Sequence, residues 1–125
     1  AEDIKMARRV RKMFGGGMRQ AGYLAAAAIY ALDNHVDRLA EDHTRAKQLG
    51  EIVNGLSFVK KLLPIETNIV GFELTDQFEQ QAFLHQLSEK GVKAVAFGHQ
   101  TVRLVTHLDF GDDQLNALEG ILKSF

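Results

Sequence analysis

The stretch Arg8–Gly22, RRVRKMFGGGMRQAG, joins a cationic run to three consecutive glycines and leads into an alanine-rich segment. Five cationic side chains lie between Arg8 and Arg19. Because glycine favours caps and turns over helix interiors, the glycines at 15–17 are expected to end one helix, and a second helix is expected to start near Met18. The residues alone leave three interpretations open: a nucleic-acid patch, a site for phosphate or another small anion, and a solvated helix face.

Helical patterns dominate the first half of the chain. Asp3–Phe14 has the periodicity of a short amphipathic helix. Tyr23–Leu32 is apolar all round, which predicts that it is buried in a core or in a subunit interface. From Asn34 onward the apolar residues fall on one side of a further helix, which Asn54-Gly55 is expected to stop.

Strand patterns appear in the second half of the chain. The predicted strands are Thr67–Leu74, Val92–Phe97 and Thr101–Leu108, the last two joined by a short hairpin link. A helix is expected from an N-cap at Asp76 to a stop at Gly91, and a last helix over 111–125. This order of elements predicts an α/β (α+β) fold with a small mixed sheet of at least three strands.

Composition excludes several classes of protein. The chain has 125 residues and no cysteine, which removes disulfides, thiol nucleophiles and zinc–thiolate sites. Its length is sufficient for one domain with a hydrophobic core. The longest apolar run is about ten residues, whereas a transmembrane helix needs about 20, and no secretory signal is visible. We therefore expect a soluble, cytoplasmic protein with no membrane partner.

The charge of the chain is unevenly distributed. Residues 1–19 hold six cationic and two acidic side chains, a net charge of +4, within a chain whose total is −1. A nucleic-acid-binding module is usually basic as a whole. The local positive charge therefore favours a small anion over a nucleic acid, and no nucleic-acid partner is expected.

Lys12 and Arg19 flank the glycines and are the candidates for holding an anion. A helix that begins after a glycine loop offers free backbone N–H groups and the positive end of its dipole. Arg19 is expected in the first turn of that helix, where it can add a bidentate contact. Lys12 is expected to end the preceding helix and to fold back across the glycines. GGGMRQ is neither a P-loop nor a GxGxxG fingerprint, so a solvated basic face remains the alternative.

Arg103 is the candidate in the second half. In TVRLVTHLD the alternation places Arg103 on the opposite face from Val102 and Leu104, with His107 as its neighbour on the same strand. An arginine in the middle of a strand is costly unless it is paired or lines a cleft, and its planar fork matches a carboxylate. A partly exposed side chain with its head in water is the alternative. The histidines lack zinc-ligand spacing, so no metal site is expected.

Two stretches together carry a family resemblance. RKMFGGGMRQAGYLAAAAIYALDNHVDRLAEDH and VRLVTHLD resemble the C-terminal third of low-specificity L-threonine aldolases, which are pyridoxal-phosphate enzymes of the aspartate-aminotransferase fold (fold type I) in the β-eliminating lyase-like group. The resemblance extends over essentially the whole chain, including Thr67–Leu74. It implies a helical segment, 1–57, that leads from a large domain, and a small C-terminal domain, 58–125, with a mixed three-stranded sheet and helices on one face.

The resemblance also implies an activity and its site residues. The family cleaves β-hydroxy-α-amino acids such as threonine and allo-threonine to glycine and an aldehyde, with pyridoxal 5'-phosphate as cofactor. Arg103 matches the arginine that holds the substrate α-carboxylate. Arg19 matches an arginine that reaches a cofactor site, that of a neighbouring subunit, and Lys12 matches a lysine near the cofactor phosphate. The implied assembly is a homo-oligomer, a dimer or tetramer, with homotetramer as the specific expectation.

One departure from the family pattern is large. In the family the lysine that forms the Schiff base with the cofactor lies upstream, in the large domain, and no lysine of this chain matches its motif. We therefore expect no catalytic residue in these 125 residues, which begin at Ala1 and would need the missing large domain to be active. The alternative is a non-catalytic, stand-alone α/β module that oligomerises through Tyr23–Leu32 and binds a small anionic ligand at the glycine loop.

Overall fold

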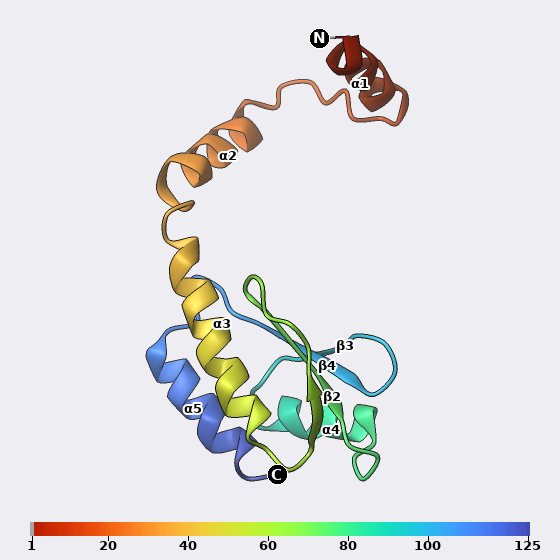
Figure 1. Cartoon of the computed structure of the whole chain (residues 1–125). Coiled ribbons are helices and arrows are strands. Elements are labelled where there is room, and N and C mark those ends of the chain that lie inside the picture. The colour runs from red at the N-terminus through yellow and green to blue at the C-terminus, as the bar shows by residue number, and fades with distance from the viewer. Residues whose placement is uncertain (1) are drawn as a thin grey trace. The chain divides into compact units, whose positions relative to one another are not determined.

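The structure is a computed structural model that describes residues 2–125, and these residues form two compact units (Figure 1). The first unit ends at Asp37, and the second unit is Arg38–Phe125. None of the helices within residues 2–125 combines the length and the apolar character needed to cross a membrane.

The first unit consists of two helices, α1 (Glu2–Met13) and α2 (Gly22–Asn34). The glycines end α1 as predicted. Gly15 has a φ of 80°, a left-handed conformation that glycine adopts without steric cost. The Gly15 N–H donates to the Lys12 carbonyl at 3.2 Å and the Gly16 N–H to the Arg11 carbonyl at 2.8 Å, the two bonds of a Schellman cap.

Helix α2 begins later than the sequence predicts. Its first residue is Gly22 and not Met18, because Gln20 takes a left-handed φ of 49° that a helix cannot include. All residues of α2 are exposed, including Tyr23 and Leu24. Within the described residues, nothing therefore buries the apolar helix, and the predicted burial would require protein outside this chain or a second copy.

The second unit is built on a four-stranded sheet. Its strands are β1 (Val59–Leu62), β2 (Ile69–Leu74), β3 (Val95–Ala96) and β4 (Thr101–Val105), in the order β1-β2-β4-β3. All three pairings are antiparallel. The sheet therefore differs from the predicted mixed three-stranded one. Strand β1 was not predicted from the sequence, because it is an irregular edge strand that carries two central lysines.

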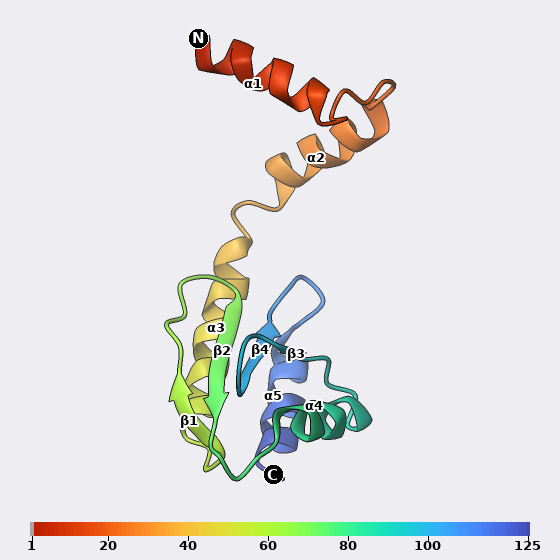
Figure 2. The ribbon, with the colours of Figure 1, turned by 90° about the vertical axis from the view of Figure 1, so that its right-hand side faces the viewer.

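Three helices contribute to one core on one face of this sheet, as expected. They are α3 (Leu39–Asn54), α4 (Gln80–Glu89) and α5 (Asp112–Leu122). Alternate residues of β2 and β4 point toward them. Figure 2 shows α3 behind β1 and β2. The buried hydrophobic side chains form one cluster, composed of Ala46, Leu49, Val53, Phe58, Val70, Phe72, Leu74, Phe83, Leu87, Val102, Leu104, Leu115, Leu118 and Leu122.

The start of α4 differs from the prediction. Asp76 is not the N-cap, because the Phe78 N–H donates to the Thr75 carbonyl in a turn that precedes the helix. Glu79 is the N-cap instead, and its carboxylate accepts from the Gln81 and Ala82 N–H groups at 3.0 and 2.6 Å. These two hydrogen bonds lower the pKa of Glu79 from its ordinary value.

Helix α3 belongs to the same unit as the sheet. The Thr106 hydroxyl, which is buried, donates to the carbonyl of Asp42 on α3 at 2.7 Å. Arg38 in turn binds the Asp42 carboxylate with two hydrogen bonds of 3.2 and 3.0 Å. A domain boundary at residue 57 stays a prediction. Within this chain the units divide between Asp37 and Arg38, because α3 packs on the sheet.

Candidate functional site

Arg103 lies in the middle of β4, on the face of the sheet that the helices leave open. Its neighbours along the strand, Val102 and Leu104, point into the core, which confirms the predicted alternation. Directly opposite Arg103 are Gly71 on β2 and Val95 on β3. The guanidinium is therefore carried by a central strand, which is a rigid support for a binding group.

Gly71 leaves space for the side chain of Leu63, which forms one wall of the site. A Cβ atom at this position would lie 2.9 Å from Cδ1 of Leu63, closer than any real side chain allows. The Leu63 N–H also donates to the Gly71 carbonyl at 2.8 Å. The Leu63 side chain therefore packs over Gly71, immediately beside Arg103.

Phe97 forms the opposite wall. The guanidinium carbon of Arg103 lies 5.6 Å from the centroid of the Phe97 ring. This distance is within the range in which an aromatic ring attracts a cation. Because Phe97 is two residues beyond Val95, it projects from the same face of the sheet as Arg103.

The two walls enclose a small cavity of about 200 Å³. Its lining consists of Leu63, Pro64, Glu66, Thr67, Ile69, Gly71, Phe97 and Arg103. The Nε atom of Arg103 is buried and has no hydrogen-bond partner among the described residues. Within residues 2–125, Arg103 also forms no ion pair with a carboxylate.

An unpaired buried donor is costly, and the usual remedy is an acceptor from a ligand. A carboxylate supplies two acceptor oxygens, which match the parallel N–H groups of an arginine fork. The chemistry of this cavity therefore fits a small molecule that carries a carboxylate.

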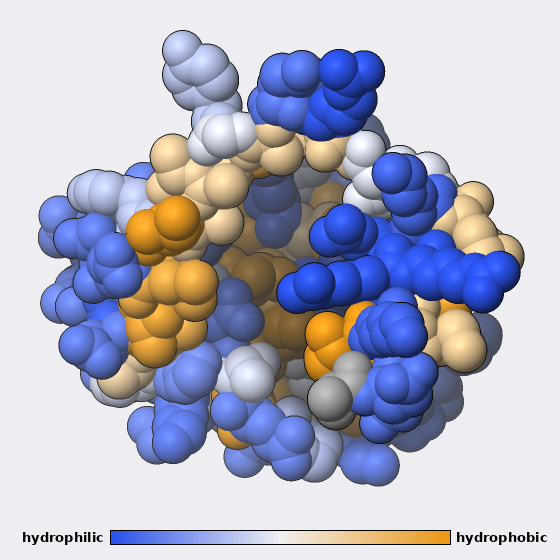
Figure 3. Space-filling view, turned by 90° about the horizontal axis from the view of Figure 1, so that it is seen from above, coloured by the Kyte–Doolittle hydropathy of each residue, from blue (hydrophilic) through white to orange (hydrophobic). Residues whose placement is uncertain are grey.

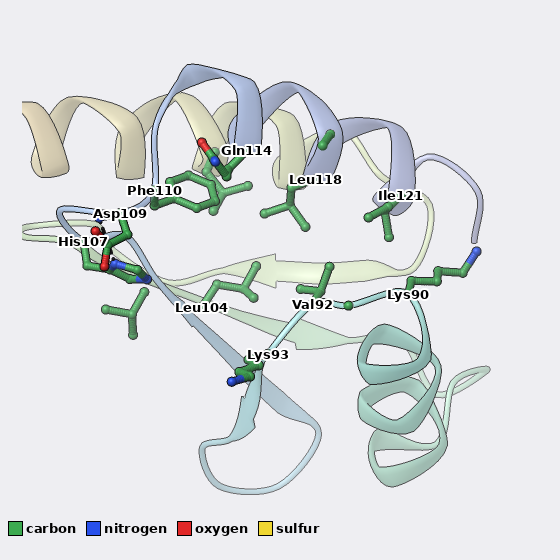
Figure 4. A pocket seen from close by; sticks show the side chains of 14 residues that line it. Lys90, Val92, Lys93, Leu104, His107, Asp109, Phe110, Gln114, Leu118 and Ile121 are labelled. Atoms are coloured by element: carbon green, nitrogen blue, oxygen red, sulfur yellow. Dashed lines mark hydrogen bonds between the residues drawn. The ribbon is translucent and has the colours of Figure 1, made fainter.

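A second, larger cavity of about 350 Å³ lies between α5 and the end of β4. Figure 4 shows His107 and Asp109 at one end of it and Lys90 at the other. The Asp109 N–H donates to Nδ1 of His107 at 3.2 Å. His107 lines this cavity and not that of Arg103, because β4 ends at Val105 and His107 begins a turn in which the Phe110 N–H donates to its carbonyl at 2.8 Å. The expectation that His107 neighbours the Arg103 site is wrong.

Lys12 and Arg19 belong to the first unit. The stem of Lys12 runs along the glycine loop as predicted, since a Cβ at Gly17 would lie 3.4 Å from Cγ and 3.6 Å from Cε of Lys12. Arg19 is not in the first turn of α2. It lies in the loop before Gly22, because the left-handed Gln20 interrupts the helix.

Both cationic side chains are available to a ligand. Lys12 and Arg19 are exposed, and neither forms an ion pair among the described residues. The start of α2 has no side-chain cap, so its first N–H groups are also free for an anion. On the face seen in Figure 3, hydrophobic side chains lie next to hydrophilic ones.

Leu63 and Phe97, the two walls beside Arg103, were not found from the sequence. For Phe97 the sequence did hold an indication: the short link 98–100 predicts a hairpin, and alternation across that hairpin places Val95 and Phe97 on the face of Arg103. For Leu63 there was none, because its role depends on an irregular segment after β1 that folds back over Gly71.

Comparisons with a family model and with curated relatives point to one family. The family model described as beta-eliminating lyase matches residues 1–77. The low specificity L-threonine aldolase of Escherichia coli K12 is 40% identical over 124 residues, which are 98% of this chain and 35% of that protein. The low-specificity L-threonine aldolase 1 of Arabidopsis thaliana is 34% identical over 107 residues, 83% of this chain and 30% of that protein. The chain thus spans about a third of the length of these relatives.

Solved structures share the fold. The cystine C-S lyase C-DES, solved with its product cysteine persulfide, matches with a TM-score of 0.68 and 20% identity, over 84% of this chain and 29% of that chain. A second structure of C-DES holds glycine covalently linked to its PLP cofactor. At this identity the likeness shows the fold, which is that of a part of a fold-type-I PLP enzyme, as the sequence predicts.

Proposed function

The chain belongs to the beta-eliminating lyase family, and on this basis we propose that it is the C-terminal part of a pyridoxal-phosphate-dependent aldolase. The proposed reaction is the cleavage of threonine, allo-threonine and related β-hydroxy-α-amino acids to glycine and an aldehyde. The relatives at 40% and 34% identity, both named threonine aldolases, support this choice within the family.

Arg103 is proposed to bind the α-carboxylate of the substrate. The observation that carries this role is the buried Nε of Arg103, which has no hydrogen-bond partner in the described part of the chain and borders a cavity on the open face of the sheet. A carboxylate held by two parallel hydrogen bonds cannot rotate freely, so Arg103 would fix the orientation of the substrate Cα. Arg103 takes no part in proton transfer, because a guanidinium stays protonated in proteins.

Lys12 and Arg19 are proposed to hold the cofactor. Pyridoxal phosphate supplies, when bound, the electron sink for the bond cleavage. The glycine loop fits its phosphate, because two cations that form no ion pair within residues 2–125 flank the glycines ahead of the start of α2, which has no side-chain cap. Arg19 is proposed to serve the site of a neighbouring subunit in a homo-oligomer, a dimer or tetramer.

The complete protein is proposed to supply the remaining machinery. The lysine that carries the cofactor would lie in the large domain, so the 125 residues alone are expected to be inactive. The proposed partners of this chain are therefore that domain, a further subunit and a small amino-acid substrate, and the proposed compartment is the cytoplasm.

Substitution of Arg103 in the complete protein tests the proposal. Arg103→Ala should raise KM for L-threonine and lower kcat, because the lost contact both binds and orients the substrate. Removal of one partner of a buried charge pair costs roughly 2–5 kcal/mol, which is about 30-fold to several thousand-fold in kcat/KM. Arg103→Lys should recover only part of the loss, because an ammonium group lacks the planar fork.

Arg45→Ala is the matched control. Arg45 lies on α3 and pairs with Asp112, on the helical side of the sheet. Its removal should leave kcat/KM for L-threonine unchanged. A kcat/KM for Arg103→Ala equal to that of the unsubstituted enzyme would show that the carboxylate assignment is wrong.

A further inference from the structure

We propose that Phe97 is a positioning residue for Arg103: its ring holds the guanidinium in the orientation in which it can grip a carboxylate with two hydrogen bonds. The inference rests on the proposed carboxylate-binding role of Arg103. Phe97 is 56% exposed, yet its ring is packed against the guanidinium, 5.6 Å from centroid to Cζ. A guanidinium is planar and weakly hydrated, so it stacks on an aromatic face more readily than an ammonium does.

The position of Phe97 is fixed by its hairpin loop. The Phe97 N–H donates to the Thr101 carbonyl at 2.8 Å, which closes the loop between β3 and β4. Gln80, at the start of α4, donates from its side-chain amide to the carbonyls of Gly98 and Thr101 at 2.9 and 2.7 Å. The ring therefore stands on a loop that is tied to a packed helix, although the ring itself is largely exposed.

A fourth hydrogen bond anchors the loop near its end at Gln100. The side-chain amide of Gln100 donates to the carbonyl of Phe78 at 2.7 Å. Gly98 adopts a φ of 87°, which allows the tight turn. These bonds explain how a loop residue can define a precise orientation for a side chain on the neighbouring strand.

The consequence concerns the conformational entropy of Arg103. A free arginine side chain has many rotamers, and ordering it when substrate arrives would weaken binding. Phe97 on one side and Leu63, packed over Gly71, on the other restrict the guanidinium before the carboxylate arrives. Preorganisation of this kind improves affinity mainly by lowering the cost of ordering.

The first test uses the 125-residue chain and needs no activity. In the ¹⁵N-labelled protein, the motion of the Arg103 Nε–H vector is measured by NMR relaxation. We expect an ordered vector in the unsubstituted chain and in Phe97→Tyr, which keeps the ring. We expect a mobile vector in Phe97→Leu, which keeps an apolar side chain without a ring. An Arg103 vector that is equally ordered in Phe97→Leu would overturn the proposal.

The second test measures kinetics in the complete enzyme. Phe97→Leu should raise KM for L-threonine by about 3- to 30-fold, the range expected for a cation–aromatic contact that is partly shielded from water. Its kcat should stay within about threefold of the original value, because Arg103 is still present. Phe97→Tyr should restore KM to within about twofold, since the ring is restored.

The outcomes separate this inference from the proposed function. If Arg103→Ala impairs the enzyme while Phe97→Leu has an unchanged KM, the positioning role is wrong and the carboxylate assignment stands. If Arg103→Ala leaves kcat/KM unchanged, the proposed function itself fails, whatever Phe97→Leu does.

Discussion

The two units of the chain differ in whether their apolar side chains are buried. In Arg38–Phe125, fourteen hydrophobic residues from the strands, the helices and the turn before β1 form one buried core. In α1 and α2 no residue is buried, although α2 is as apolar as a core helix. The second unit therefore contains the contacts that stabilise it, whereas the first exposes apolar side chains, as a surface for contact with other protein would.

The candidate sites show the same contrast. Arg103 is held on a central strand between two walls that belong to its own unit. Lys12 and Arg19 are exposed, and within residues 2–125 they have no acidic partner. Arg103 lies in a cavity lined by its own unit, whereas Lys12 and Arg19 are open to solvent. These surroundings suit the two proposed roles, a substrate contact in the small domain and a cofactor contact shared with other protein.

The largest expected effect sharpens the contrast in stability. Phe83 is buried, with its ring centroid 5.0 Å from that of Phe58 and 4.8 Å from that of Phe125. Phe83→Ala should lower the free energy of unfolding of the second unit by about 3–5 kcal/mol, through lost contacts and the cavity left behind. Chemical denaturation followed by circular dichroism measures the change.

Phe14→Ala makes the same substitution in the first unit. Phe14 is 87% exposed, so this variant should change the free energy of unfolding of the second unit by less than about 0.5 kcal/mol. Equal losses in the two variants would contradict the division of the chain into one self-stabilised and one uncovered unit.

The next effect concerns Arg19 in the complete enzyme. Arg19→Ala should weaken pyridoxal-phosphate binding by roughly 10- to 150-fold, the range for hydrogen bonds to a charged group. Fluorescence titration of the apoenzyme with the cofactor measures this. Hybrid oligomers of Arg19→Ala subunits with subunits that lack the cofactor-carrying lysine should regain activity if the site is shared. Absence of regained activity in verified hybrids would place Arg19 in the site of its own subunit.

The smallest effect concerns the exposed face of α2. The 125-residue chain should self-associate, because Ile29 and its neighbours otherwise stay in water. Ile29→Glu should weaken that association by about tenfold, since it places a charge in an apolar contact. Sedimentation equilibrium measures both, and Gln48→Glu, which adds the same charge to an exposed position on α3, is the control. A chain that stays monomeric at high concentration would contradict the expectation.

Periodic stretches and glycine signals were sufficient to predict most elements. The strand predicted at Thr67–Leu74 contains β2, and the glycines at 15–17 predict the end of α1. Elements that depend on tertiary contacts were not predictable. β1 is stabilised by pairing with β2, although Lys60 and Lys61 disfavour a strand, and the start of α4 depends on a turn ahead of Glu79.

For the candidate site, the sequence identified the charged residues but not their surroundings. Arg103 stands out because an arginine between Val102 and Leu104 interrupts an apolar strand. The walls beside it were not identified: Phe97 follows from alternation across the predicted hairpin only once its pairing is considered, and Leu63 lies in an irregular segment that no local pattern marks. Arg19 was placed in a helix because residue preferences do not reveal the left-handed Gln20.

The most direct test of the central claim is a crystal structure of the complete protein with glycine bound at the active site. We expect two guanidinium nitrogens of Arg103 to lie about 2.7–2.9 Å from the two carboxylate oxygens of glycine, with the Phe97 ring still packed against the guanidinium. A structure in which other residues hold the carboxylate, and Arg103 makes no contact with it, would show that the carboxylate assignment is wrong.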